Sequence, residues 1–353
     1  FGWDVHGLPI EMEVQKELGL EDPQQIDDYG IAKFNEACRS QVQTNTENWE
    51  RVTRKIGRWV DFENDYKTMD IDFMESVWWV FKELWENELI YKDYKVLPYS
   101  WAAATPLSNF EANMDYRDVE DPSIFFTLRA RNDHNKIKKD DEFLVWTTTP
   151  WCIPGNLAIA VGEKIKYSRI LLNNKNYWIA SERLDELNDH EYQIIDESIG
   201  SDLIGGEYVP AYDEFENEYL NGAFRIIHSD DTNTDSGSGL VSQAPAYGES
   251  DFYALKKGGI NAIVDPVTLS GKFDSSVKGL ENKYVKDADA IIIKQLDERK
   301  LLFSQTTEMH SYPFCWRTGE PLIYKAIPTW FVSVEKIRER MVELNNETHW
   351  VPG

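Results

Sequence analysis

The sequence has little cysteine and histidine. Its three cysteines, Cys38, Cys152 and Cys315, lie far apart, and none belongs to a CxxC pair. This spacing excludes a disulfide framework and a zinc knuckle, and it is typical of a reducing compartment. The six histidines show no metal-ligand spacing. We therefore expect a cytoplasmic protein.

Long apolar runs are also missing. No stretch approaches the roughly 18 apolar residues that a membrane span needs, and the N-terminus does not resemble a signal peptide. The hydrophobic share of 42% is instead that of a globular chain with sizeable cores. A length of 353 residues predicts two or more domains. We expect no membrane association.

Positive charge is scarce, since the formal net charge is −25. Net charge alone argues against binding to nucleic acid, but it does not exclude a local basic patch or one in another part of a longer protein. The chain begins at Phe1, and Gly2-Trp3-Asp4 resembles the end of a strand. We expect an internal fragment rather than a processed mature chain.

Apolar periodicity divides the chain into helix-rich and strand-rich parts. One amphipathic helix is predicted between residues 70 and 90, with Trp78 and Trp85 in a core rather than in a ligand stack. Alternating runs predict strands between about 120 and 228: DPSIFFTLRA, EFLVWTTTP, KYSRILL, NYWIAS, YQIIDE and AFRIIHS. Helical spacing returns after residue 283, a buried strand is predicted at 321–332, and Ser333 is placed to cap a further helix. This order favours one domain inserted in another.

One loop is superficially similar to a calcium site. Asp231, Asn233 and Asp235 stand at alternate positions, but Ser236 replaces the required glycine and Ser242 the required glutamate. We predict no metal site in this chain.

Polar residues follow apolar strands in three places. GWDVHGLPIE (2–11) carries Asp, His and Glu where a strand breaks into Gly and Pro, which is typical of a ligand-binding strand end or of a charged turn. VWTTTPWCIPGNLAIAV offers three adjacent hydroxyls, and GSGLVSQAPAYGESDFYA offers the carboxylate of Asp251. Hydroxyls position water or a ribose, and a carboxylate holds an ammonium group. From the residues alone, a polar pocket and ordinary strand ends both remain open.

These stretches resemble one family. GWDVHGLPIE is similar to the GWDxHGLPIE signature of isoleucyl-tRNA synthetases, which are class I enzymes. Further blocks resemble that family in the same order, over essentially the whole chain: RWVDFENDYKTMDIDFMESVWWVFKEL, LPYSWAAATPLSNFEA, WTTTPWCIPGNLAIAV, APAYGESDFY and YPFCWRTGEPLIYKAIPTWFV. The family's HIGH and KMSKS motifs are not in this sequence, and we expect them before Phe1 and after Gly353.

The resemblance implies an α/β fold, in which a class I Rossmann catalytic domain is interrupted by a β-rich α/β editing domain, connective peptide 1. On this basis residues 1–120 are part of the first Rossmann half with a helical connection. Residues 121–305 are the editing domain, and residues 306–353 return into the second half. The implied activity is ATP-dependent ligation of isoleucine to tRNA(Ile), with hydrolytic editing of mischarged valyl-tRNA. Magnesium-bound ATP, isoleucine, valine and the tRNA are the implied ligands of a monomeric enzyme.

Editing is needed because valine lacks one methylene of isoleucine. One methylene contributes only about 1–3 kcal/mol of discrimination, a range for which isoleucyl-tRNA synthetase itself is the standard example. The family assigns the isoleucine amino group to Asp4. In the editing pocket it assigns adenosine and water binding to Thr147, Thr148 and Thr149, and the valyl ammonium to Asp251. Pocket and support positions fall on Trp151, Asn156 and Ser242.

The expected catalytic residues are Thr149 and Asp251. A carboxylate paired with an ammonium group is a weak base, so water placement is expected to carry the hydrolysis. Cys152 stands where the family usually has threonine, and Ser242 where it usually has histidine. Zinc-binding cysteine pairs of some relatives are reduced to Cys315, so no zinc is expected. A free-standing aminoacyl-tRNA deacylase and a non-catalytic tRNA-binding paralogue remain as alternatives.

Overall fold

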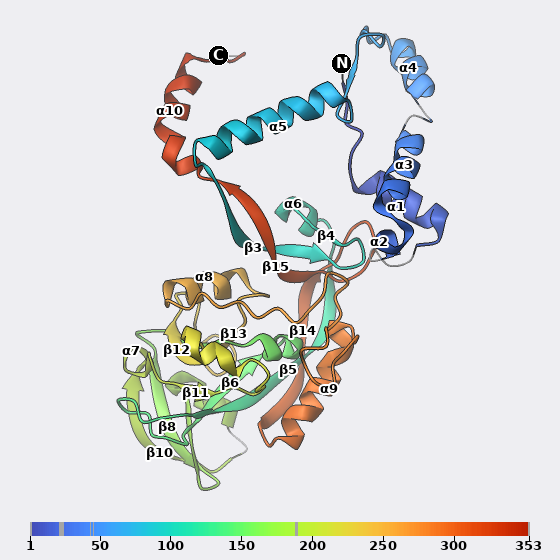
Figure 1. Ribbon diagram of the computed structural model, residues 1–353. Coiled ribbons are helices and arrows are strands. Elements are labelled where there is room, and N and C mark those ends of the chain that lie inside the picture. Colours follow the sequence, from blue (N-terminus) through green and yellow to red (C-terminus); the bar gives the residue numbers. More distant parts are fainter. Residues whose placement is uncertain (1, 21–24, 43, 45, 188–189, 352–353) are drawn as a thin grey trace. The chain divides into compact units, whose positions relative to one another are not determined.

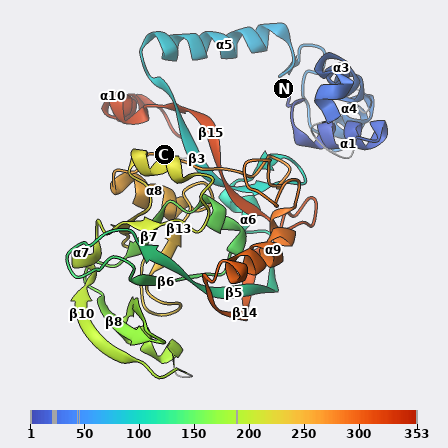
Figure 2. The ribbon, with the colours of Figure 1, turned by 60° about the horizontal axis from the view of Figure 1, so that its bottom comes forward.

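The computed structural model describes residues 2–20, 25–42, 44, 46–187 and 190–351, and these form two compact units. One unit combines residues 1–94 with 328–353, and the other comprises residues 95–327. Figures 1 and 2 show the elements of each. The second unit is therefore inserted within the sequence of the first. The α/β class predicted from the sequence is confirmed, whereas the predicted boundaries at 121 and 305 remain predictions.

The first unit is mainly helical. Its short strands pair in parallel, with Gly2 opposite Tyr66. Helices α1 and α3 pack together and bury Val14 and Phe34. The elements are β1 (Gly2–Trp3), α1 (Leu8–Leu18), α2 (Gln25–Tyr29), α3 (Ile31–Val42), α4 (Thr46–Lys55), β2 (Tyr66–Lys67), α5 (Ile71–Glu86) and α10 (Val334–Glu347).

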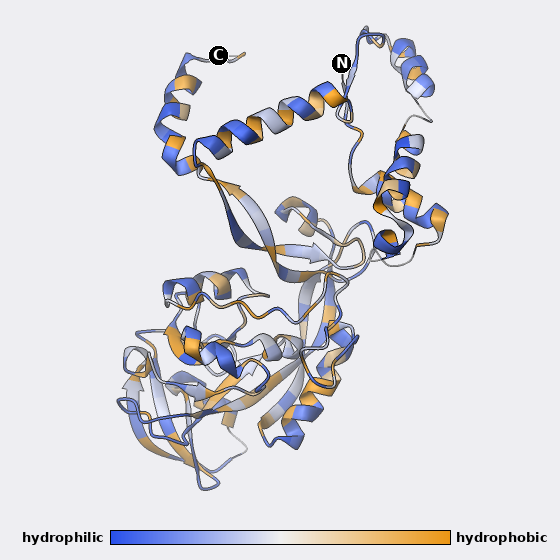
Figure 3. Ribbon diagram, viewed as in Figure 1, coloured by the Kyte–Doolittle hydropathy of each residue, from blue (hydrophilic) through white to orange (hydrophobic). Residues whose placement is uncertain are grey.

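Helix α5 confirms the amphipathic helix predicted between residues 70 and 90, and Figure 3 shows apolar residues recurring along it between polar ones. The placement of its tryptophans in a core is wrong for the described residues. Trp78 is 68% exposed and Trp85 is 56% exposed. An apolar stripe is buried only where another element covers it, and α5 has no buried residue.

The second unit is built on a large mixed sheet. Among the described residues ten strands join it, in the order β10-β8-β9-β6-β13-β7-β12, with β5 pairing β6, β11 and β14. The predicted strands of this region are present. The strands are β5 (Tyr116–Ala130), β6 (Glu142–Thr147), β7 (Ala158–Val161), β8 (Lys166–Leu172), β9 (Lys175–Ala180), β10 (Gln193–Ile199), β11 (Tyr208–Val209), β12 (Arg225–His228), β13 (Val241–Gln243) and β14 (Leu302–Pro313).

Helices and short turns complete this unit. Helix α9 packs against η1 and β14, as Figures 1 and 2 both show for the strand. The helical elements are α6 (Asn109–Ala112), η1 (Pro150–Gly155), η2 (Ser181–Leu187), α7 (Gly200–Leu203), η3 (Glu216–Asn221), α8 (Glu249–Lys257) and α9 (Val285–Glu298). A smaller sheet has the order β15-β3-β4, from β15 (Ile323–Val332), β3 (Ile90–Ser100) and β4 (Thr105–Pro106), and β3 and β15 both continue in sequence across the unit boundaries at residues 94 and 328.

The core of the second unit lies along the central strands. Strand β7 is buried at all four residues. Strands β12 and β13 pair with its two edges, and its apolar side chains point into the core on both faces of the sheet. Aromatic side chains fill much of the interior, and the largest fully buried ones are Trp178, Tyr99, Tyr167, Tyr208, Phe126 and Phe143. This rigid interior holds the ends of β6 and β13 in place.

Candidate functional site

Two parallel strands bring the predicted editing residues together. Strand β13 runs parallel to β6, with Val241 opposite Trp146. The next residues along these two strands, which run in the same direction, are Ser242 and Thr147. Parallel strands end at the same edge of a sheet, where ligands bind in α/β proteins. The segments that follow both strands border one site at this edge.

The threonine stretch forms a hydroxyl pair at this edge. The side chains of Thr147 and Thr149 lie 3.2 Å apart between their Oγ1 atoms, and the Thr149 backbone N–H donates to Thr147 Oγ1 at 3.1 Å. Thr148, between them, is half-buried. Each hydroxyl can both donate and accept, so the pair can orient a water molecule or a ribose hydroxyl.

Asn156 connects the turn after η1 to strand β13. Its amide Nδ2 donates to Ser242 Oγ and to the Ala158 carbonyl, both at 2.9 Å. Its Oδ1 accepts from the Tyr208 hydroxyl at 2.6 Å. The amide is thus bonded on both sides, which fits the supporting role expected for Asn156 and fixes the orientation of the Ser242 hydroxyl.

Asp251 lies in the first turn of α8, just beyond the end of β13. Its Oδ2 accepts the Ala244 backbone N–H at 2.8 Å, and its Oδ1 accepts from the Ser250 hydroxyl at 3.4 Å. Burial raises the pKa of Asp251 to about 6, and the hydrogen bond from Ala244 opposes this rise. The group is therefore mostly ionised at neutral pH, and a bound ammonium group would favour that charge further.

Cys152 lies on the short helix η1 and packs against the core of this unit. Burial raises its pKa, and the negative charges of Asp251 and Asp289 add to the effect, while a hydrogen bond with Thr149 opposes it. A thiol in such surroundings stays protonated, and only the thiolate is a strong nucleophile. Cys152 is therefore a packing residue of this site and not a nucleophile.

Trp151 packs against Tyr247 beneath the threonine stretch. Trp151 is buried, and the two ring centroids lie 4.8 Å apart at an interplanar angle of 59°. The space beside them is tight, since a side-chain carbon on Gly155 would come within 3.0 Å of the Tyr247 ring. Trp151 is thus a closely packed, buried residue next to the threonine stretch and does not form an open surface.

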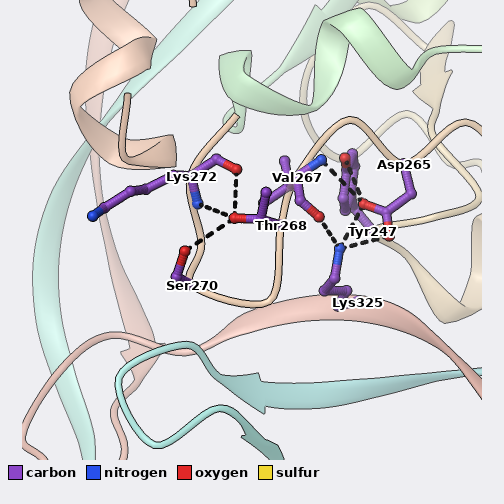
Figure 4. Close-up of polar contacts among 7 residues, drawn as sticks. All are labelled: Tyr247, Asp265, Val267, Thr268, Ser270, Lys272 and Lys325. Atoms are coloured by element: carbon purple, nitrogen blue, oxygen red, sulfur yellow. Dashed lines mark hydrogen bonds and ion pairs between the residues drawn. The ribbon is translucent and has the colours of Figure 1, made fainter. Parts of the chain in front are cut away.

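A buried ion pair holds Tyr247 from behind, as Figure 4 shows. The Tyr247 hydroxyl donates to Asp265 Oδ1 at 3.1 Å, and Lys325 Nζ reaches both oxygens of Asp265, at 2.7 and 2.5 Å. Lys325 Nζ also donates to the Val267 carbonyl. Burial lowers the pKa of Lys325, and the charge of Asp265 opposes this. The hydrogen bond from Tyr247 to Asp265 therefore holds the Tyr247 ring in its position against Trp151.

Asp4 does not belong to this set of residues. It follows β1 in the other unit, where it is exposed, and its neighbours Val5 and His6 bond to Thr68. The structure thus places Thr147, Thr149, Trp151, Asn156, Ser242 and Asp251 on connected elements of one unit, whereas Asp4 belongs to the other unit.

Sequence reasoning missed several polar residues of the site. Asp289 accepts the Trp151 backbone N–H, Tyr208 bonds Asn156, and Asp265 with Lys325 supports Tyr247. One signal was available for Asp289, which stands at a helical spacing among the apolar residues of KYVKDADAIIIKQL. A carboxylate on the apolar face of a helix calls for a buried partner.

Metal clusters and membrane-spanning helices are both absent from the described part of the chain. No group of three or more His, Cys, Asp or Glu side chains there is arranged to hold a metal ion. No helix there has the length and apolar character to cross a membrane. The absence of zinc remains a prediction.

Comparisons with known proteins place the sequence in a defined group. Residues 1–353 match the family described as tRNA synthetases class I (I, L, M and V). The isoleucine–tRNA ligase of Protochlamydia amoebophila is 45% identical over 356 residues, with 100% of this chain and 34% of that protein covered. The ligase of Bdellovibrio bacteriovorus is 44% identical over 357 residues, with 100% and 33% covered. The chain thus spans about a third of the length of these relatives.

Among solved structures, the P. falciparum cytosolic leucyl-tRNA synthetase editing domain aligns with 52% of this chain and 99% of its own length. The TM-score is 0.40 and the sequence identity is 8%.

Proposed function

The chain belongs to the class I tRNA synthetase family of the isoleucine, leucine, methionine and valine enzymes, and we propose that it is the part of an isoleucyl-tRNA synthetase that carries the editing site. The complete enzyme would ligate isoleucine to tRNA(Ile) with magnesium-bound ATP as substrate, as a cytoplasmic monomer. Asp4 would bind the isoleucine amino group in the synthetic site. Residues 121–305 would form the editing domain.

The editing reaction that this site would perform is hydrolysis of valyl-tRNA. The bond between the valyl carbonyl carbon and the ribose oxygen of the terminal adenosine breaks. Water adds its hydroxyl to the carbonyl carbon, and its remaining proton goes to the ribose oxygen, so that valine and tRNA leave. The Thr147–Thr149 hydroxyl pair would orient this water, with Thr148 beside the adenosine.

Asp251 would hold the valyl ammonium while the hydroxyls act on the ester. Its two oxygens already accept N–H and O–H donors, so the carboxylate is fixed before a ligand arrives. An ammonium partner stabilises the ionised form, and this makes Asp251 an anchor and a weak base. Trp151 and Ser242 would border the side chain of the amino acid, and Asn156 would keep Ser242 in place.

One observation carries the proposal: the hydroxyl pair and the carboxylate follow two parallel, adjacent strands at the same edge of one sheet. Its test is deacylation of purified valyl-tRNA(Ile) by the intact protein without ATP. We expect release of valine well above the rate without protein. Absence of any acceleration, from protein shown to be folded, would contradict the editing assignment.

A further inference from the structure

The short helix η1 begins in an unusual way, because the side chain of the residue before it does not cap it. Thr149 occupies the N-cap position, and threonine there normally accepts a backbone N–H of the first turn through its hydroxyl. Here the Thr149 side chain makes no such bond. Its hydroxyl is instead paired with that of Thr147 and also makes a hydrogen bond with the Cys152 thiol. Pro150 has no N–H, and the Cys152 N–H donates to the Thr149 carbonyl at 3.0 Å. The Trp151 N–H therefore needs an acceptor from elsewhere.

Asp289 supplies that acceptor from a distant helix. Its Oδ1 accepts the Trp151 backbone N–H at 2.8 Å, across 138 residues of sequence. Asp289 is only 6% exposed and shares the inner face of α9 with Val285, Ile292 and Leu296. A carboxylate so buried is costly unless a donor satisfies it. The cap on η1 provides such a donor.

The surroundings of Asp289 hold it in place. Lys286, one turn earlier on α9, donates to Asp121 at 2.8 Å, and His310 lies 3.0 Å from the same Asp121 oxygen. Burial raises the pKa of Asp289 to about 7, and the charge of Lys286 opposes this rise. Asp289 thus contacts η1 next to the hydrogen-bonded charged group of Lys286, Asp121 and His310.

We propose that Asp289 is a positioning residue for deacylation: by capping η1 from outside, it releases the Thr149 hydroxyl from capping and leaves it paired with Thr147 toward the ester. This inference rests on the proposed function. If the Asp289 acceptor is lost, the Thr149 side chain is expected to rotate and to accept the Trp151 N–H itself. The water-orienting pair would then be broken while the binding of the aminoacyl end persists.

Two substitutions separate the cap from the charge. Asp289→Asn keeps an oxygen that can accept the Trp151 N–H. Asp289→Leu has no acceptor and leaves the Trp151 N–H unpaired, so the folding of this variant is checked directly. Asp297→Asn is a matched control, because it removes the same charge from an exposed position of α9.

The readout is steady-state deacylation of valyl-tRNA(Ile) by the intact protein, with melting temperatures measured in parallel. We expect Asp289→Leu to lower kcat about 10- to 100-fold with KM changed less than about twofold, and Asp289→Asn to stay within about threefold of the parent. Asp297→Asn is expected to behave as the parent. Deacylation within twofold of the parent by folded Asp289→Leu would overturn the inference, as would an equal loss in Asp289→Asn.

A double-variant cycle tests whether Asp289 acts through Thr149. If it does, Asp289→Leu has little further effect once Thr149 is replaced by alanine, whereas independent roles would give multiplied losses and overturn the inference. If Asp289→Leu fails to fold, the same cycle with Asp289→Ser, whose shorter side chain withdraws the acceptor, takes its place. Lack of activity in the parent protein would count against the proposed function instead.

Discussion

Asn156 Nδ2 donates a hydrogen bond to Ser242 Oγ at 2.9 Å, which ties the end of η1 to strand β13. The serine hydroxyl is therefore held toward the buried amide, and the side chain is smaller than the histidine expected at this position. In the proposed editing pocket a larger side chain here would exclude isoleucine by size, and serine would not.

The parent protein is expected to discriminate poorly and to deacylate correctly charged isoleucyl-tRNA as well as valyl-tRNA. Ser242→His should restore rejection of isoleucyl-tRNA and keep cleavage of valyl-tRNA, because the larger ring fills the pocket. Ser242→Ala is the control, since it removes the hydroxyl without adding volume. The measurement is the ratio of the two deacylation rates. A parent that already rejects isoleucyl-tRNA about 100-fold, equivalent to about 2.7 kcal/mol, would refute the prediction.

Asp251→Ala should slow deacylation of valyl-tRNA about 10- to 100-fold, because it removes the carboxylate placed for the ammonium group. Asp251→Asn should lose nearly as much, since the amide can still accept the Ala244 N–H but carries no charge. Glu249→Ala, at an exposed position in the same turn of α8, serves as the control. Unchanged rates in Asp251→Asn would show that charge at this position is not used.

The stability of the protein should depend on pH through Asp289. Burial raises its pKa from 3.8 to about 7, so the folded state holds the proton more tightly than the unfolded state between these values. Stability from this group is therefore lost as pH rises through that window. Asp289→Asn cannot ionise and should escape this loss.

Urea unfolding at pH 5 and pH 8 tests this prediction. Relative to the parent, Asp289→Asn should gain about 1–3 kcal/mol in free energy of unfolding between pH 5 and pH 8. Asp251, whose pKa is raised to about 6, titrates in both proteins and cancels in the difference. A difference that does not change with pH would contradict the expected ionisation of Asp289.

Lys325→Met should destabilise the second unit by about 2–4 kcal/mol, because it leaves the Asp265 carboxylate without its cation. The upper range for buried pairs is reduced here, since 25% of the Asp265 side chain is exposed. Lys257→Met breaks an ion pair with Asp230 whose side chains are 68% and 77% exposed, and it should leave the free energy of unfolding nearly unchanged, because solvent screens the pair. Equal losses in the two variants would contradict the role of burial.

Residues 95–327 should fold alone and melt cooperatively, because they form one compact unit. The shorter segment 121–305, predicted as a domain from the sequence, should fold as well but melt at a lower temperature. It lacks residues 116–120 of β5 and 306–313 of β14, so the β5–β14 pairs beyond Ile124–Gln305 are lost, and it also lacks Lys325. Calorimetry of both segments provides the comparison. A higher melting temperature for the shorter segment would show that the added strands do not stabilise the unit.

Much of this protein could be predicted from local patterns. The alternating run at DPSIFFTLRA gave strand β5, and the three- and four-residue spacing between residues 70 and 90 gave helix α5. The threonine stretch and Asp251 stood out because polar groups followed apolar strands. Such features depend on neighbours within a few residues, so they can be recognised from the sequence alone.

The sequence by itself determined the family, the alternation of helices and strands, and the residue types at the candidate site. Only the tertiary structure decided which side chains meet: Asp289 with Trp151 across 138 residues, and Ser242 with Asn156 across 86. It also left Trp78 and Trp85 exposed, although their spacing was that of a core. The physical reason is common to these cases. Burial and hydrogen bonding depend on what covers a side chain, and the covering element comes from a distant part of the chain.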